Sequence, residues 1–322
     1  MAAAGPTAGT DLLFTGDVFC DLVFAGVEVP EIGAEVYAQG FAITPGGVAT
    51  RAFAAARAGA TTKILGRLGD DPLGAHVLAV LAAEPDLGTD LIDQVAGQTP
   101  VSVSLTGSRD RSFVTYREPL GSRELPDDHG PIGAVHVGVE QKLPAWVARL
   151  RDAGTTIVGG VGWDHTGQWA AEVLDRLAEV DVFVPNDVEA MRYTRTDDAV
   201  SAAKVLAERV PLAIVTRGRD GAVAVDSATG AMTEVPSIPV DVVDSTGAGD
   251  VFVATFMAAA RYDWTLTERL RFAALNAAIS VTGHGGAVSA PRPGELAAFL
   301  HEHRPDGDWS FAGLATTRGE DR

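Results

Sequence analysis

The chain has 322 residues, of which 46% are hydrophobic and 21% charged, so it can bury a large core. Its formal net charge of -18 argues against nucleic acid as a partner, because phosphate backbones require clustered Lys and Arg. The single cysteine, Cys20, excludes an intramolecular disulfide and fits a reducing compartment. No apolar run approaches ~20 residues and the N-terminus has no signal-peptide pattern, so we expect a cytoplasmic protein with no membrane partner.

Strand-like and helical patterns alternate along most of the chain, and apolar residues at period two mark two hairpins. In chain order, the expected elements are strand 11–15, half-exposed strand 35–44, helix 47–59, strand 61–69, helix 71–84, hairpin 101–117, strands 134–139 and 155–158, helix 168–178, strand 182–184, helix 199–209, strand 213–216, hairpin 221–235, and helices 265–281 and 294–302. The tail 303–322 is expected to be loosely held.

This alternation predicts an α/β fold in which a mainly parallel sheet is covered by helices on both faces, a three-layer sandwich. Residues 1–322 show no repeat and no composition break, so we expect a single domain. Strands within 17–44 and 101–117 do not fit inside such a sheet and predict a small β lid. Because exposed strand faces often pair, we also expect a homodimer.

One glycine-rich stretch, Val240–Ala260, carries the clearest chemical signal. An apolar run stops at Asp244, and Gly247 and Gly249 then precede Asp250 and a segment of helical length. The spacing matches neither a P-loop nor a dinucleotide fingerprint. Glycines at a helix N-terminus let unpaired amides approach an anion. Asp250 is then either an ordinary helix cap or a general base beside that anion.

The segment "DSTGAGDVF" resembles the C-terminal signature of the ribokinase-like (PfkB) carbohydrate kinases. Five further resemblances follow the family's order along the chain, and together they are strongly specific. Besides that signature, the matching segments are "GDVFCDLVF" at 16–24, "PGGVATRAFAAARAG" at 45–59, "VPNDVEA" at 184–190, "VTRGRDGAVAV" at 215–225 and "NAAISVTGHGGAVSAP" at 276–291. The resemblance implies a ribokinase-like fold and an enzyme that uses ATP with Mg²⁺.

By this resemblance Asp250 is the general base, and the amides of Gly247, Ala248 and Gly249 hold the transferring phosphoryl group. Asn186 and Glu189 would order hydrated Mg²⁺ through water. The alternative is a helix start in which these two residues form a capping box, and both roles can hold together. The residues implied to line the nucleotide are Asn186, Thr216, Arg217, Gly218, Gly221, Thr246, Gly247, Gly249, Asn276 and Gly286.

A monovalent cation such as K⁺ is implied at Asp244 and Thr246, with Ser289 opposite. The alternative interpretation is a hydrogen-bonded turn. On the substrate side, the resemblance implies that Asp21 accepts sugar hydroxyls. A lone charge inside "FCDLVF" would be costly, which favours that role over a solvated acid.

Gly46 and Gly47 would let the main chain approach the substrate, unless they only form a strand-to-helix turn. Relatives often carry asparagine four residues after the second glycine, where this chain has Arg51. Either the substrate bears a carboxylate or phosphate, or Arg51 turns outward on its helix. Glu140 lies where ribokinases place a substrate-binding acid and could equally be a solvated residue after a strand.

The leading hypothesis is therefore an ATP-dependent kinase that phosphorylates a hydroxyl, expected to be a hydroxymethyl group, of a sugar or sugar-like compound. The alternative is a non-catalytic sugar- or nucleotide-binding regulatory protein on the same scaffold, which the replacement at Arg51 keeps open. The sequence does not separate sugars, sugar acids, nucleosides and cyclitols as substrates.

Overall fold

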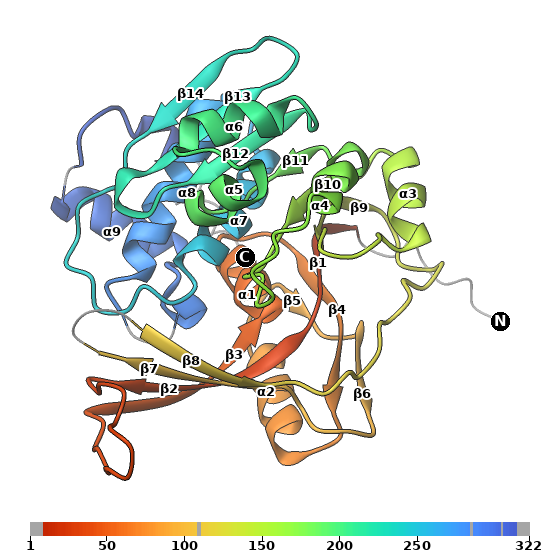
Figure 1. The fold of residues 1–322 in the computed structure, drawn as a ribbon. Helices are drawn as coiled ribbons and strands as arrows, with labels where there is room; N and C mark the ends of the chain where they lie inside the picture. The colour runs from red at the N-terminus through yellow and green to blue at the C-terminus, as the bar shows by residue number, and fades with distance from the viewer. Residues whose placement is uncertain (1–8, 108–110, 284–285, 304, 314–322) are drawn as a thin grey trace.

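The computed structural model describes residues 9–107, 111–283, 286–303 and 305–313. A central sheet crosses this part of the chain, with the strand order β14-β13-β12-β11-β10-β9-β1-β4-β5 and with β6 beside β4 (Figure 1). Its strands are β1 (Thr10–Thr15), β4 (Thr62–Gly69), β5 (Leu87–Gly88), β6 (Ile92–Val95), β9 (Ile132–Gly138), β10 (Thr156–Gly160), β11 (Val182–Phe183), β12 (Leu212–Thr216), β13 (Ala222–Asp226) and β14 (Met232–Val235).

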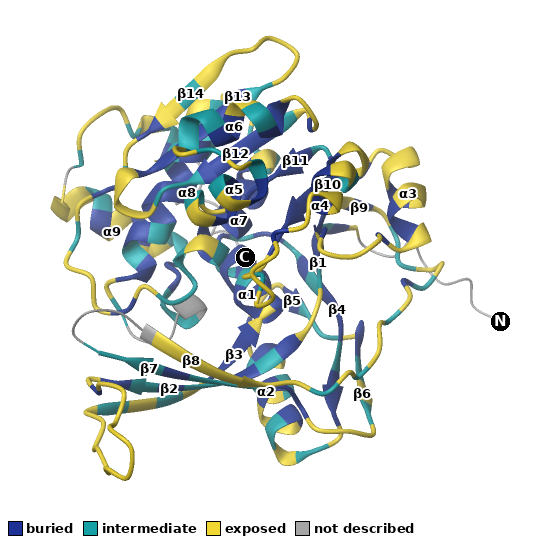
Figure 2. Cartoon of the chain, viewed as in Figure 1, coloured by how far each residue is buried: buried dark blue, intermediate teal, exposed yellow. Residues whose placement is uncertain are grey.

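The strand pairs from β5 to β12 are parallel, and β13 and β14 extend the sheet as an antiparallel hairpin. The central strands are buried on both faces, as their continuous apolar runs predict (Figure 2). The second predicted hairpin is confirmed, with its strands joined through residues 227–231.

Helices form a layer on each face of this sheet, and each layer encloses its own hydrophobic cluster. One cluster takes residues from α1 (Val48–Arg57), α2 (Pro72–Ala82), α7 (Ala248–Ala258), α8 (Leu266–Ser280) and α9 (Pro293–His303). The other takes residues from α3 (Ala145–Asp152), α4 (Glu172–Asp175), α5 (Asp187–Thr194) and α6 (Ala199–Ala207). The three-layer α/β sandwich is therefore confirmed.

A separate four-stranded sheet forms the lid, with the order β3-β2-β7-β8. Its strands are β2 (Val18–Ala25), β3 (Gly40–Gly47), β7 (Val101–Thr106) and β8 (Arg111–Tyr116). The half-exposed strand expected at 35–44 lies instead at Gly40–Gly47. Its ladder ends where Ala25 pairs with Gly40, because Gly26 (φ 67°) turns the chain away from the sheet.

Two further expectations need correction. The helix expected at 168–178 is only the short α4 followed by a 3-10 turn at Arg176–Glu179, because the Asp164 carboxylate accepts the amides of Thr166 and Trp169 and holds a loop there.

The tail is packed as far as residue 313: the Trp309 indole donates to the carbonyls of Pro305 and Asp306, and its neighbour Phe311 lies 5.0 Å from the ring of Trp264. The rest of the expected tail lies outside the described residues.

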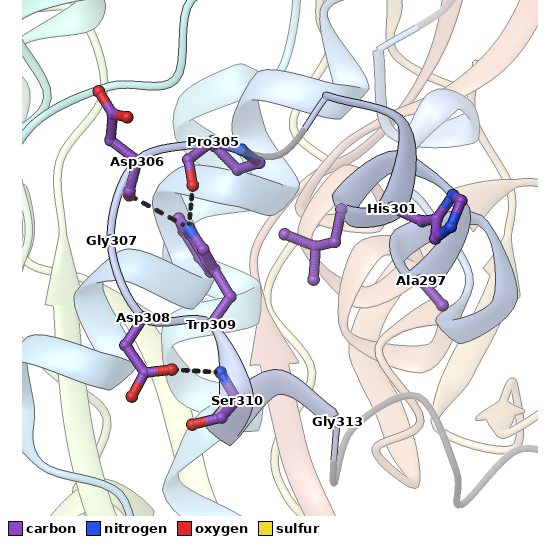
Figure 3. Close-up of a pocket in the computed structure, with 10 residues that line it drawn as sticks. Ala297, His301, Pro305, Asp306, Gly307, Asp308, Trp309, Ser310 and Gly313 are labelled. Carbon is purple, nitrogen blue, oxygen red and sulfur yellow. Dashed lines mark hydrogen bonds between the residues drawn. The ribbon is translucent and has the colours of Figure 1, made fainter.

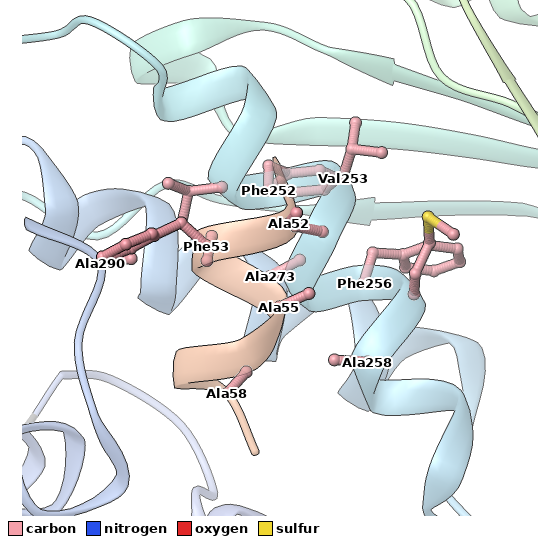
Figure 4. Close-up of a cluster of buried hydrophobic side chains, with 14 of the residues drawn as sticks. Ala52, Phe53, Ala55, Ala58, Phe252, Val253, Phe256, Ala258, Ala273 and Ala290 are labelled. Atoms are coloured by element: carbon pink, nitrogen blue, oxygen red, sulfur yellow. The ribbon is translucent and has the colours of Figure 1, made fainter. Parts of the chain in front are cut away.

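Alanines on α1 let that helix approach α7 closely (Figure 4). Ala52 and Ala55 are fully buried and lie among Phe252, Phe256 and Ala273 of α7 and α8. Because alanine adds only one methyl group, the two helix backbones can lie close together at this contact. This packing brings the first turns of α1 and α7 side by side. Among the described residues, none of the helices combines the length and the apolar character needed to span a bilayer.

Candidate active site

The first turn of α7 carries the glycine-rich stretch. Gly247 (φ 75°) occupies the N-cap position and makes no side-chain cap bond. Asp250 lies one turn further on and does not cap the helix, so the cap interpretation of this residue is not supported. Within the described part of the chain, the amides of Gly247 and Gly249 have no hydrogen-bond acceptor, and that of Ala248 reaches Ser245 O only at 3.4 Å. These amides are free to bind an anion.

Asp250 is held by an ion pair from the neighbouring helix. The Arg51 guanidinium lies on the first turn of α1, and its Nη2 is 2.8 Å from Asp250 Oδ1. The two side chains are 23% and 29% exposed, so a ligand can reach both. Arg51 therefore turns inward, against the alternative in which it points to solvent. Its Nε is buried and has no hydrogen-bond partner among the described residues.

Asp21 lies against the glycine pair of the lid. A Cβ atom at Gly46 would come within 2.1 Å of the Asp21 carboxylate, so only glycine fits there. Gly47 has φ 63°, and a Cβ there would lie 2.4 Å from the carbonyl oxygen of Asp17. Burial, and then the charge of Asp250, raise the pKa of Asp21 to about 7 from its ordinary 3.8. Asp21 and Asp250 thus belong to one electrostatic cluster.

Glu140 stands just past the end of β9 and shapes the loop that follows β10. The side chain is exposed, and its Oε1 accepts the amide of Gly162 at 2.5 Å. Arg176 donates to the backbone carbonyl of Glu140 at 3.0 Å. Glu140 is therefore anchored at the edge of the sheet, near the site, in a loop-holding role that the sequence did not predict.

His136 belongs to the same cluster and was missed by the sequence analysis. It is 3% exposed, and its Nδ1 has no hydrogen-bond partner among the described residues. Burial, and then the charge of Arg51, hold the pKa of His136 well below its ordinary value, so the imidazole is neutral. The available signal was one polar residue in the apolar run "VHVGVE", two positions before Gly138 at the end of the strand and four before Glu140.

Asn186 and Glu189 start α5 as a capping box. Asn186 Oδ1 accepts the amide of Glu189 at 2.8 Å, and Glu189 Oε2 accepts the amide of Asn186 at 2.9 Å. The pKa of Glu189 is raised to about 7, first by burial, while the charge of Arg51 acts to lower it. The box leaves Glu189 Oε1 unused, which is sufficient for an indirect Mg²⁺ contact through water.

The turn between β12 and β13 lies beside this capping box. An isolated bridge joins Asn186 and Thr216, and the amide of Thr216 donates to Pro185 O at 3.1 Å. Gly218 (φ 52°) and Gly221 (φ 82°) shape the turn. Arg217 Nη1 is 2.9 Å from Glu234 Oε2 on β14, so its charge is engaged there. The structure thus brings the Asn186 and Thr216–Gly221 motifs together.

The remaining predicted residues lie on and around α8. Asn276 is 2% exposed and donates to Phe272 O at 2.8 Å within its own helix, so the structure does not bring its side chain to the turn at Thr216–Gly221. Asp244 Oδ1 accepts the amide of Thr246 at 2.9 Å, which matches the expected hydrogen-bonded turn.

The segment that contains Gly286 and Ser289 lies next to Asp244. The amide of Asp244 donates to Val281 O at 3.1 Å, and a Cβ at Gly283 would lie 2.8 Å from Ser289 Oγ. Gly286 begins the 3-10 turn Gly286–Ser289. The two residues before it lie outside the described residues. Among those that are described, no group of three His, Cys, Asp or Glu side chains is placed to hold a metal.

A separate hollow of about 630 Å³ lies between α9 and residues 305–313 (Figure 3). Leu300, His301 and Trp309 are among the residues that line it. It contains none of the predicted site residues, and the candidate active site is instead the junction of α1, α7, the lid and the ends of β9 and β12.

Residues 10–293 match the family described as "pfkB family carbohydrate kinase". The chain is 26% identical to Fructokinase-1 of Zea mays, over 92% of this chain and 99% of the relative. It is 31% identical to the ATP-dependent ribose-1-phosphate kinase of Halopiger xanaduensis, over 90% of this chain and 98% of the relative. The structure of Arabidopsis thaliana ribokinase complexed with ribose and ATP superposes with a TM-score of 0.76 at 23% identity, covering 91% and 99% of the two chains.

Proposed function

Since the chain belongs to the pfkB family of carbohydrate kinases, we propose that it transfers the γ-phosphate of ATP to a hydroxymethyl group of a sugar or sugar-like substrate. One observation carries this proposal. Asp250 is next to the amides of Gly247 and Gly249, which have no acceptor among the described residues, and lies in the same electrostatic cluster as Asp21. A proton acceptor, an anion-binding turn and a hydroxyl acceptor therefore meet in one place.

The chemistry follows from these positions. Asp21 accepts hydrogen bonds from substrate hydroxyls, and the bare backbone of Gly46 leaves room for the ring. Asp250 takes the proton of the attacking hydroxyl. That oxygen forms a bond to the γ-phosphorus as the bond from this phosphorus to the β–γ bridging oxygen breaks, and ADP leaves. The proton on Asp250 then returns to solvent.

The amides of Gly247, Ala248 and Gly249 stabilise the charge on the transferring phosphoryl group. They belong to the backbone of a helix N-terminus, so they need no rearrangement when charge develops. An aspartate is adequate as the base here, because phosphoryl transfer depends mainly on positioning and on charge stabilisation.

We place the nucleotide along the turn Thr216–Gly221, beside Asn186. Glu189 Oε1, which takes no part in the capping box, fits a hydrated Mg²⁺, which binds through few carboxylates and keeps several waters. Bound with ATP, Mg²⁺ would neutralise charge on the β- and γ-phosphates. For a monovalent cation such as K⁺ we propose the turn at Asp244 and Thr246 facing Ser289, where the buried hydroxyl of Thr246 has no partner among the described residues.

The lid excludes water from the site and limits ATP hydrolysis without substrate. Arg117 Nη1 lies 2.6 Å from Asp17 Oδ2, which joins the end of β8 to the turn before β2. The lid also exposes Phe41, Val114 and Tyr116. We propose that this exposed face pairs in a homodimer, which light scattering would detect as twice the chain mass of 33.4 kDa.

The direct test is product formation. The protein is incubated with Mg·ATP and a panel of sugars, sugar acids, sugar phosphates, nucleosides and cyclitols, and phosphorylated products are identified by mass spectrometry. We expect product from at least one class and none with Asp250→Asn. Failure of every class at high protein concentration would count against the proposal.

One observation favours a second function, a non-catalytic binding protein: the ion pair to Arg51 engages the carboxylate that the reaction needs. In that case calorimetry would show binding of a panel member and of ATP, while no product would form. Replacement of Arg51 by Asn, the residue that relatives often carry, would then not restore turnover.

A further inference from the structure

Arg51 breaks a local rule of helix electrostatics. Its position in the first turn of α1 puts a positive charge at the positive end of the helix dipole. That turn, all of it described, holds no acidic side chain to offset the charge. The N-terminus of α7 meets it at the same place and adds a second positive dipole end. The ion pair with Asp250 offsets part of this cost, and departures from local preference are expected at functional sites.

The guanidinium of Arg51 has hydrogen-bond donors that its ion pair with Asp250 does not use. A guanidinium offers five N–H groups in a planar fork, and here one nitrogen faces Asp250 at 2.8 Å. Its Nε is buried and without a partner among the described residues. A buried donor with no acceptor is costly, whereas a carboxylate or phosphate could bind two nitrogens of the fork at once.

Among the described residues, Arg51 forms an ion pair with Asp250, and its other neighbours offer it little negative charge near pH 7. His136 is neutral and keeps Nδ1 without a partner among the described residues. Glu140 is turned toward the amide of Gly162. The carboxyls of Asp21 and Glu189 each have a pKa of about 7, so near pH 7 each is only partly charged. Repulsion of a further anion is therefore weaker than the number of carboxylates suggests.

Asp250 cannot serve Arg51 and the substrate equally well. As the proposed base, it must present its carboxylate to the attacking hydroxyl, and its hold on Arg51 then weakens. Arg51 would be left with an unpartnered charge beside two helix N-termini unless the ligand supplied an anion. A substrate anion would take over the guanidinium and release the base in a single binding event.

Building on the proposed kinase function, we propose that the substrate carries an anionic group, a carboxylate or a phosphate, that binds Arg51. Arg51 would thus determine specificity, and its ion pair with Asp250 would keep the base occupied until the anionic substrate arrives.

The test compares wild type with Arg51→Asn and Arg51→Lys on matched substrate pairs. One arm sets aldonic acids against their parent aldoses of the same carbon number and configuration, and the other sets sugar 1-phosphates against the free sugars. The readout is the ratio of kcat/KM for the anionic and the neutral member. Arg149→Asn, which removes an exposed arginine on α3, is the charge-matched control.

We expect wild type to favour the anionic member of one arm by about tenfold or more, since a bidentate charge-assisted contact contributes strongly. Arg51→Asn should lower that ratio by a similar factor and Arg51→Lys by less, while Arg149→Asn leaves it unchanged. The arm that responds distinguishes a carboxylate from a phosphate.

The inference would be overturned if wild type used the neutral members equally well or better and if Arg51→Asn left the kcat/KM ratio unchanged. The kinase function would then remain intact. If no pair is turned over, the same pairs are titrated by calorimetry into Asp250→Asn and into the double variant with Arg51→Asn. Anion binding that the second substitution abolishes supports the inference, and absence of anion binding to either variant rejects it. Melting curves of each variant check folding.

Discussion

The nucleotide side and the substrate side of the site are held together in different ways. Around Asn186 and Thr216–Gly221, a capping box and a tight turn join residues a few positions apart, and one isolated parallel bridge links Asn186 to Thr216. On the substrate side, Arg51 from α1 meets Asp250 from α7, and Asp21 from the lid faces Gly46 on the next strand. The first region is built from local hydrogen bonds and the second from charges brought together by tertiary packing.

This difference suggests how one scaffold keeps a nucleotide site while its substrate changes. Local motifs satisfy their own polar groups and fold with little help from the rest of the chain. In contrast, one substitution in the substrate cluster alters the charge that several neighbours experience, because the pKa shifts of Asp21 and His136 arise first from burial and then from the charges of Asp250 and Arg51. We therefore expect mutations on the two sides to have separable effects.

The largest effect is expected from Asp250→Asn. The amide cannot accept the hydroxyl proton, so kcat should fall by about 10²- to 10⁴-fold. ATP affinity should change little, because the amides of Gly247 and Gly249 are backbone groups. Rapid-quench kinetics and calorimetry with a non-hydrolysable ATP analogue measure the two quantities. A kcat within tenfold of wild type would remove Asp250 from the role of base.

A pair of glycine substitutions tests whether the two sides separate. In Gly46→Ala the new methyl group would meet the Asp21 carboxylate at 2.1 Å, and in Gly221→Ala it would meet Val235 O at 2.0 Å. Displacement of about 1 Å can cost roughly a hundredfold in activity. We expect Gly46→Ala to raise KM for the sugar and Gly221→Ala to raise KM for ATP. By that estimate, each constant should rise by about tenfold or more.

Gly294→Ala is the matched control, since its Cβ meets nothing within 4 Å on the exposed start of α9. Both KM values should stay at their wild-type levels in this variant. If Gly46→Ala and Gly221→Ala raised both constants equally, the two sides would behave as one unit, contrary to the comparison above.

The sequence was most informative where the structure is local. The strand and helix alternation, the lid strands and the capping box of Asn186 and Glu189 all follow from patterns within short windows. The freedom of the amides at Gly247 and Gly249 also agrees with the glycine spacing.

The substrate cluster could be predicted only in part. The chain position of Arg51 marked it as unusual, but its ion pair depends on how closely the alanines of α1 let that helix approach α7. Nothing near His136 in the sequence indicates that Arg51 will lie beside it and help keep it neutral. The short α4 escaped prediction for a related reason, because the side-chain bonds of Asp164 override helical spacing at Thr166 and Trp169.

A smaller, pH-dependent effect is expected from Asp21→Asn. The folded-state pKa of Asp21, about 7, lies above its ordinary 3.8, so its carboxyl is uncharged in the fold at pH 5 and must ionise as the pH rises through 7. Between pH 5 and pH 7 the folded state holds this proton while the unfolded chain has already lost it. The free energy of unfolding of wild type therefore falls as the pH rises through this range, and that of the uncharged Asn variant does not. The Tm of Asp21→Asn minus the Tm of wild type should therefore be larger at pH 8 than at pH 5 by a few degrees.

Differential scanning calorimetry at the two pH values measures this gain. Glu189 and His136 are present in both proteins, so their own titrations largely cancel in the difference. A Tm difference that stays constant from pH 5 to pH 8 would mean that Asp21 is already ionised in the fold at pH 5.

The smallest effect is expected from Arg217→Gln on the nucleotide side. Arg217 pairs with Glu234, whose side chain is 46% exposed, and such partly solvated pairs contribute about 1 kcal/mol or less. Because this charge is directed at β14, KM for ATP should rise less than about fivefold on the same energetic scale. Arg51→Gln gives the contrast on the substrate side, where KM for the sugar should change by more. If steady-state kinetics ranked the two arginines in the opposite order, the nucleotide side would also depend on a long side chain placed by tertiary packing, and the division between the two sides would fail at that residue.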